Sequence, residues 1–339
     1  MAHSQSPPLP PTGLPSRAKA FTRRHFLAGL GLLAGAGVLA PVLRRAQRPS
    51  AASIEAGRPL LGTWVRVVAR HPDRDRATRA VERAFAAVGE VDAQMSVHRA
   101  DSELSRLNRA AGLGPLSVSP ALLEVVEQAC ASARRSGGFY DPTVLPLMTL
   151  YGFYGPERAS LPTTAEVDRA LAAVAFEDVQ VERGAGTIAL ARRGMGLDLG
   201  SIGKGWAVDR AVAALQAEGV TSGLVDAGGN VYGLGVPEDG TDGWSVALFH
   251  PRTGRAERVF TLRDAAVATS ANNERYRVIA GHRLGHILDA KRGTPADGHV
   301  SVSVLARTGV ESDQMSTAAF LLGPGRFRGW PGSLDALFL

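Results

Sequence analysis

Cysteine is almost absent from this chain of 339 residues, which contains Cys130 alone. A single cysteine excludes an intramolecular disulfide and any metal site built from several thiolates of one chain. Cys130 falls in a helical pattern of apolar residues with Leu122, Val126 and Ala133, so we expect it to be a small buried side chain. The hydrophobic content of 45% is sufficient for an ordinary core.

Acidic residues are missing from the first 50 positions, which hold seven Lys and Arg residues. The whole chain has a formal net charge of +6, so residues 51–339 have a net charge of about −1. That part has no basic excess with which to neutralise the phosphates of a nucleic acid, the main source of affinity in such complexes. We therefore expect no nucleic-acid partner.

The paired arginines Arg23 and Arg24 precede an uncharged run over residues 26–43 that is rich in Gly, Ala and Leu. A twin arginine before a weakly apolar segment is typical of bacterial signals that export folded proteins. The alternative is an inner-membrane anchor, because about 18 apolar residues can barely span a bilayer. We predict that residues 1–50 form a disordered N-terminus and this signal, with a periplasmic or otherwise extracytoplasmic location. Any membrane contact is expected through this segment only.

Helix and strand patterns alternate over the about 285 residues that follow, enough for one large domain. Period-two patterns predict strands, and apolar residues three and four apart predict helices. Strands are expected at 63–69, 178–182, 187–191, 222–226, 230–235, 244–249, 257–262, 266–268, 275–279 and 299–306, and helices at 75–93, 102–108, 119–136, 164–174, 204–218 and 312–322. Several adjacent strands look like hairpins rather than βαβ units, which favours the α+β class. We predict one domain over 51–339, with two intimate subdomains, mixed or antiparallel sheets and flanking helices.

The segment from Asp198 to Asp209 concentrates glycines, Lys204 and two acidic residues where a strand passes into a helix. Glycine lets backbone amides approach a ligand, and a helix N-terminus presents unpaired N–H groups and partial positive charge to phosphate. A P-loop is excluded, because Asp198 and Gly205 stand where it needs Gly and Ser or Thr. A match to the Rossmann fingerprint at 29–34 lies inside the predicted signal. The segment therefore indicates a nucleotide-phosphate site of another kind.

Further sequence blocks stand in a fixed order around this segment. They are Leu61-Gly-Thr63, Met95 to Asn108, Gly137 to Leu147 with Tyr151-Gly-Phe153, Gly228-Gly-Asn230, Ala268-Thr-Ser270, His286-Ile-Leu-Asp289 and Asp313-Gln-Met-Ser-Thr317. The ordered set resembles the ApbE family of FAD:protein FMN transferases over about residues 57–324. The resemblance implies an enzyme that uses Mg²⁺ and FAD as a substrate, transfers FMN to a threonine hydroxyl and releases AMP. The implied partner is an FMN-binding acceptor protein of a respiratory or redox complex.

The resemblance also implies roles for individual residues. Asp313 and Thr317, four positions apart on one helical face, would ligate the metal with a backbone carbonyl at Ser201. From its own chemistry, His286 is the best candidate for the general base that accepts the proton of the threonine hydroxyl, since its reference pKa near 6.5 suits that task. The residues implied to contact FAD are Leu61, His98, Phe139, Tyr140, Asp141, Asp198, Lys204 and Ile287. The residues alone leave open simpler roles: a helix cap for Asp313, packing for Thr317, solvation for Lys204, a loop position for His98 and a structural position for His286.

Two loops depart from the family pattern. Ala290-Lys-Arg-Gly293 replaces a Pro and a Thr-Gly pair, and Ala271-Asn272 replaces a glycine and an acid. The metal pair and the Asp198 segment are intact, so a transferase with altered loop contacts is the simplest interpretation. Two alternatives stay open: a metal-dependent FAD pyrophosphatase that yields FMN and AMP, and a non-catalytic FAD-binding assembly factor.

Overall fold

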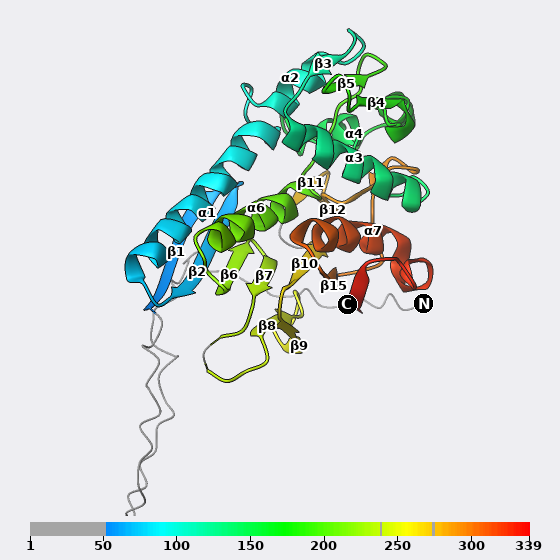
Figure 1. Ribbon diagram of the computed structural model, residues 1–339. Coiled ribbons are helices and arrows are strands. Elements are labelled where there is room, and N and C mark those ends of the chain that lie inside the picture. The colour runs from blue at the N-terminus through cyan, green and yellow to red at the C-terminus, as the bar shows by residue number, and fades with distance from the viewer. Residues whose placement is uncertain (1–51, 238, 273–274) are drawn as a thin grey trace, which may run out of the picture. The chain divides into compact units, whose positions relative to one another are not determined.

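A seven-stranded antiparallel sheet, in the order β1-β2-β6-β7-β10-β15-β16, is the framework of the protein (Figure 1). The computed structural model describes residues 52–339, apart from 238 and 273–274. The strands are β1 (Ala52–Leu60), β2 (Thr63–His71), β6 (Ser222–Ala227), β7 (Asn230–Leu234), β10 (Ala265–Ala271), β15 (Ser301–Ala306) and β16 (Ser333–Phe338). Each neighbouring pair is antiparallel, as the hairpin-like spacing predicts.

Other elements pack on both faces of this sheet. Helices α1 (Arg74–Met95), α6 (Gly203–Ala217) and α7 (Gly309–Phe327) pack together on one face. The hairpin of β8 (Trp244–Phe249) and β9 (Ala256–Leu262) covers part of the other face. Because successive side chains of a strand point to opposite faces, Val67 packs in the helical core while Val68 packs with Phe260 of the hairpin.

A second group of elements lies between α1 and α6 in the sequence. Its helices are α2 (Glu103–Arg109), α3 (Pro120–Arg135), α4 (Leu145–Leu150) and α5 (Thr164–Leu171), and its strands are β3 (Leu116–Ser117), β4 (Val179–Glu182) and β5 (Thr187–Leu190). Two small hairpins, β11 (Tyr276–Ile279) with β12 (His282–Gly285) and β13 (Leu288–Asp289) with β14 (Thr294–Pro295), lie between β10 and β15 in the sequence. The described residues belong to one compact unit.

The expected helices and strands are present in this α+β fold, with changed boundaries. Ser119 caps α3 by accepting the N–H of Leu122, and Cys130 is buried, as the pattern predicts. Helix α7 begins at Gly309 rather than near 312, because Thr308 accepts the N–H of Glu311. Asp313 therefore lies inside α7 and does not cap its own helix.

Two predictions about the N-terminal segment stay predictions. The twin-arginine signal and the disordered N-terminus over residues 1–50 lie outside the described residues. In the part that is described, no helix has the length and apolar character needed to cross a bilayer.

Candidate active site

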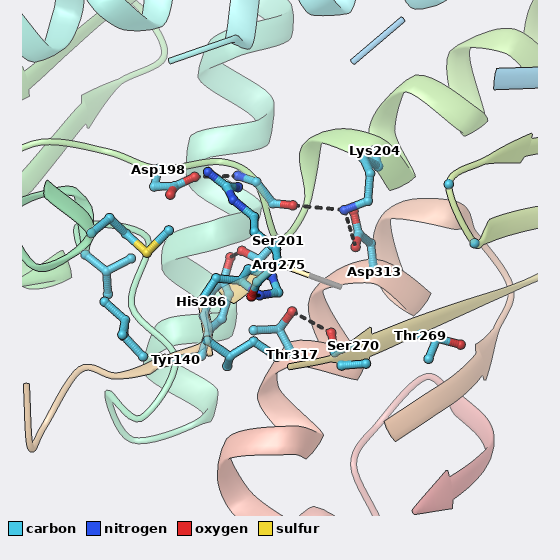
Figure 2. Close-up of a pocket in the computed structure, with 18 of the residues that line it drawn as sticks. Tyr140, Asp198, Ser201, Lys204, Thr269, Ser270, Arg275, His286, Asp313 and Thr317 are labelled. Carbon is cyan, nitrogen blue, oxygen red and sulfur yellow. Dashed lines mark hydrogen bonds and ion pairs between the residues drawn. The ribbon is translucent and has the colours of Figure 1, made fainter. Parts of the chain in front are cut away.

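A cavity of about 360 Å³ lies where the loops at one end of the sheet meet α6 and α7. Its lining includes Leu61, Tyr140, Asp141, Asp198, Ser201, Lys204, His286, Ile287, Asp313 and Thr317, together with Thr269, Ser270 and Arg275 (Figure 2). The structure thus brings together every residue of the predicted site except His98 and Phe139. These residues come from segments more than 250 positions apart in the chain, which is why only the fold assembles them.

Asp313 and Thr317 occupy successive turns of α7 and face the cavity. Asp313 is 4% exposed, and its Oδ2 accepts the N–H of Gly205 at 2.9 Å. Its Oδ1 lies 3.7 Å from the ammonium of Lys204. The hydroxyl of Thr317 is 3.0 Å from the hydroxyl of Ser270 at the end of β10 (Figure 2).

This donor set fits a hard divalent cation. It consists of one buried carboxylate with hydroxyl and backbone oxygens, whereas no cluster of three His, Cys, Asp or Glu side chains suited to a metal occurs among the described residues. Mg²⁺ accepts such a set, because it takes few protein ligands and leaves other positions to water and phosphate. The buried carboxylate of Asp313 uses Oδ2 for the N–H of Gly205, and its Oδ1 faces only the ammonium of Lys204. Oδ1 is therefore available to bind a cation.

Helices α6 and α7 cross at a pair of glycines. A Cβ atom on Gly205 would lie 2.1 Å from the carbonyl oxygen of Gly309, so any side chain there would push the helices apart. The carboxylate of Asp209 accepts the N–H groups of Gly309 and Val310 at 2.7 and 2.9 Å. The crossing and this cap together fix the position of Asp313 relative to the start of α6.

The buried cap predicts a pH-dependent component of stability. Burial raises the pKa of Asp209 to about 6, although its two backbone hydrogen bonds act in the opposite direction. The folded state therefore holds the proton more tightly than the unfolded state, so this contribution is complete below about pH 4 and is lost as pH rises through 6. The unfolding free energy of the wild-type protein should fall by roughly 1–3 kcal/mol between pH 4 and 6.5, and Asp209→Asn should not show this fall. Guanidinium unfolding of both proteins across this range checks the difference, and superimposable pH profiles would contradict it.

His286 is held as a neutral imidazole with its free nitrogen unprotonated. Its Nδ1 lies 3.0 Å from the backbone carbonyl of Arg275, which can only accept, so Nδ1 carries the hydrogen and donates. Burial, followed by the charge of Arg275, lowers the pKa of His286 to about 4. The lone pair of Nε2 is therefore available to accept a proton throughout the neutral pH range.

Asp198 anchors a polar cluster on the wall of the cavity. Its Oδ1 accepts the N–H of Gly200 at 2.7 Å, and its Oδ2 accepts the hydroxyl of Tyr154 at 2.9 Å. The guanidinium of Arg275 lies 5.1 Å from the centre of the Tyr154 ring. The ring of His98 packs edge-on against Tyr154 at 5.1 Å, so His98 is one side chain removed from Asp198 and does not line the cavity.

The predicted run Phe139-Tyr140-Asp141 divides into three different environments. The hydroxyl of Tyr140 accepts a hydrogen bond from Ser201 at 3.1 Å, inside the cavity. Asp141 lines the cavity, but its carboxylate accepts three hydrogen bonds, from the amide and hydroxyl of Thr143 and from the amide of Phe176. Burial raises the pKa of Asp141. Phe139 lies outside the cavity lining, between the side chains of Lys291 and Arg326.

The sequence did not single out Arg275, Thr269 and Ser270, which line the cavity, or Tyr154, which donates to Asp198 without lining it. Ala268-Thr-Ser270 was recognised only as a block, and Arg275 was placed inside an expected strand at 275–279. The structure instead leaves Arg275 just before β11, with its side chain on the cavity. An arginine five residues after a block that enters the site was the available signal.

Comparisons with known proteins identify the family of the chain. The model of the ApbE family matches residues 61–337. The chain belongs to the ApbE family. Among its relatives, a FAD:protein FMN transferase of Treponema pallidum is 34% identical, with 81% of this chain and 80% of that protein aligned. Another of that name from Salmonella typhimurium is 31% identical, over 89% and 87% of the two chains.

Solved structures of ApbE proteins share the fold. The Thermotoga maritima ApbE protein superposes with a TM-score of 0.76 at 28% identity, over 85% of this chain and 94% of that one. The flavin transferase ApbE of Vibrio cholerae gives a TM-score of 0.72 at 30% identity, over 82% and 89%. The predicted family and the predicted α+β fold are therefore both confirmed.

Asn272, one of the two departures from the ApbE pattern, has a defined structural contact. Its amide nitrogen donates to the carbonyl of Ala296 at 2.9 Å, and its Oδ1 accepts the N–H of Ile287 at 3.3 Å. The side chain therefore holds the segment that carries His286 beside the end of β10. This departure preserves a positioned His286 instead of disrupting the site.

Proposed function

We propose that this ApbE protein is a Mg²⁺-dependent FAD:protein FMN transferase that modifies a threonine hydroxyl of an FMN-binding acceptor. The observation that carries the proposal is the position of a neutral, partly buried His286 in the same cavity as the oxygen donors Asp313 and Thr317. Relatives that align over most of the chain bear the name FAD:protein FMN transferase.

The cavity supplies separate partners for the parts of FAD. Lys204 and Arg275 offer positive charge to the pyrophosphate. Leu61, Tyr140 and Ile287 present apolar surface for the rings. Mg²⁺ would be held by the Asp313 carboxylate, the Thr317 hydroxyl and a carbonyl at Ser201, and when bound it neutralises charge on phosphoryl oxygens.

The protein's own chemical task is to activate and align the acceptor hydroxyl. Nε2 of His286 takes the proton of the threonine hydroxyl as its oxygen forms a bond to the FMN phosphorus. The bond from that phosphorus to the bridging oxygen breaks, and AMP leaves with the electron pair. Lys204 and Arg275 offset the negative charge that develops, and fixed positions of all these groups supply most of the rate enhancement.

An extracytoplasmic site of action forms part of the proposal. Support comes from the sequence alone, through the paired Arg23 and Arg24 before the apolar run at 26–43. A signal that exports folded proteins suits an enzyme that leaves the cytoplasm with FAD already bound. Fractionation of cells that express the full chain, with Arg23→Lys/Arg24→Lys as the comparison, tests it. Equal periplasmic amounts of both proteins would contradict this route.

The same residues would serve a pyrophosphatase if water replaced the threonine, so product analysis decides between the two. The protein is incubated with FAD, Mg²⁺ and a periplasmic FMN-binding domain, and the acceptor is weighed by intact mass spectrometry. A mass increase equal to one FMN, dependent on Mg²⁺ and on an acceptor threonine, is expected. Free FMN and AMP without modified acceptor would identify a pyrophosphatase, and intact bound FAD with several acceptors would identify an assembly factor.

The lowered pKa of His286 predicts an unusual pH profile. The kcat/KM for transfer reports the protonation state of the free enzyme, in which this imidazole is neutral above about pH 4. We expect kcat/KM to be flat between pH 6 and 8, where an unperturbed histidine would titrate near 6.5. Initial rates at constant ionic strength and saturating Mg²⁺ check this, and an inflection near pH 6.5 would contradict it.

A further inference from the structure

Four exposed cationic side chains next to the cavity lie over aromatic rings. Lys291 and Arg326 each lie 5.0 Å from the centre of the Phe139 ring, Arg134 lies 5.9 Å from Phe176, and Arg135 lies 5.7 Å from Trp330. Among the described residues, none of the four cations is within ion-pair distance of a carboxylate. We call Arg134, Arg135, Lys291 and Arg326, with these rings, the basic surface.

The basic surface is continuous, although its four cations come from three segments, the end of α3, the loop after β13 and the end of α7. A Cβ atom on Gly138 would lie 3.4 Å from Cε of Lys291 and 3.8 Å from the Phe176 ring. The N–H of Ala290 donates to the carbonyl of Phe139 at 3.4 Å. These contacts join the end of α3 to the loop after β13, and Arg326 brings the end of α7 onto the same Phe139 ring.

Each of the three segments also continues directly into the cavity. Phe139 precedes Tyr140, Lys291 lies three residues after Leu288, and Arg326 lies five residues after Leu321, beyond the break of α7 at Gly323. Tyr140, Leu288 and Leu321 all line the cavity. Leu288 is itself two residues from His286. These connections place the basic surface beside the cavity, within reach of a macromolecule that presents a side chain to His286.

We propose that the basic surface docks the acceptor protein by binding acidic side chains near the hydroxyl that is modified. This inference rests on the proposed transferase function. Cations that lie over rings keep their charge and a restricted geometry, so they attract carboxylates without first breaking an internal ion pair. Residues 51–339 as a whole have a net charge of about −1, so the positive charge of the basic surface is a local feature. Lys291 belongs to the loop that departs from the ApbE pattern, so the surface is partly a feature of this chain.

The test compares Lys291→Ala/Arg326→Ala with wild-type protein in the FMN transfer assay. We expect the KM for the acceptor to rise about tenfold at low salt, as loss of two docking charges implies, with kcat and the KM for FAD within about twofold. The acceptor KM of the wild-type protein should rise with salt more steeply than that of the variant. Arg252→Ala/Arg263→Ala removes two exposed charges around the β8–β9 hairpin and should leave all these values unchanged. Lys291→Arg/Arg326→Lys keeps both charges and should restore the acceptor KM.

The outcomes separate this inference from the function on which it rests. A wild-type protein that transfers FMN to no acceptor overturns both. A wild-type protein that transfers FMN, with an unchanged acceptor KM and salt dependence in Lys291→Ala/Arg326→Ala, overturns the docking surface alone. Binding of wild-type protein to vesicles of anionic lipid that the variant loses, with the same acceptor KM in both, would assign the surface to a membrane instead.

Discussion

Asp313→Ala is expected to lower the rate of FMN transfer by about a thousandfold or more at physiological Mg²⁺, since charge neutralisation is the main contribution to phosphoryl transfer. The substitution removes the buried carboxylate that faces the cavity and leaves the N–H of Gly205 without its acceptor. Stability should fall by only about 1–3 kcal/mol, the usual effect of one unsatisfied buried donor. Initial transfer rates across a Mg²⁺ titration, together with a denaturation curve, measure both effects.

Asp313→Asn separates the metal role from the structural role. The amide oxygen can still accept the N–H of Gly205, so this variant should fold like the wild-type protein and still lose transfer. Calorimetric titration of Mg²⁺ should show weakened binding in both variants, a readout that does not depend on turnover. Asp297→Asn, at an exposed position, is the matched control and should bind Mg²⁺ normally. Full transfer by Asp313→Asn at saturating Mg²⁺ would contradict the assignment of Asp313 as a metal ligand.

The sequence predicts those helices and strands whose spacing of apolar residues reflects burial of one face or of both faces. Helix α1 shows this, because Val81, Phe85 and Val88 are all buried at helical spacing. Strand β1 was not predicted, since it contains Gly57 and Pro59 and is only partly buried. Its conformation depends on antiparallel pairing with β2 along the whole strand, from Ala52 to Leu60. The local sequence pattern does not encode such pairing. Strand β16 depends in the same way on its pairing with β15.

The site shows the same division between local and tertiary information. The glycines of the Asp198 segment indicate close approach, and Gly205 does approach, but its neighbour is the backbone of α7 rather than a ligand. The resemblance implied an FAD contact for the whole run Phe139-Tyr140-Asp141, but Phe139 lies outside the cavity lining, since successive residues of a loop can face different surroundings. Arg275 acquires its place from the fold after β10. Spacing thus locates the segments that contribute to the site, whereas side-chain direction requires the structure.

His286→Ala is expected to lower the rate of transfer by about a hundredfold to ten-thousandfold, the usual contribution of a general base. FAD binding should be weakened far less, because Lys204, Arg275 and the oxygen donors stay in place. The acceptor hydroxyl has a pKa far above neutral, so without Nε2 its proton must go to water as the new bond forms. Single-turnover flavinylation with FAD already bound measures the loss directly.

A purely structural role for His286 would give a different pattern. Its Nδ1–H bonds to the carbonyl of Arg275, so removing the ring could displace Arg275 and weaken FAD binding. In that case added imidazole would not restore activity, whereas a missing proton acceptor should be partly replaced by free imidazole that enters the space of the ring. His282→Ala, which removes an exposed histidine from β12 of the neighbouring hairpin, should transfer FMN at the wild-type rate. Imidazole rescue confined to His286→Ala therefore distinguishes proton transfer from positioning, and its absence together with lost FAD affinity would assign His286 to the support of Arg275.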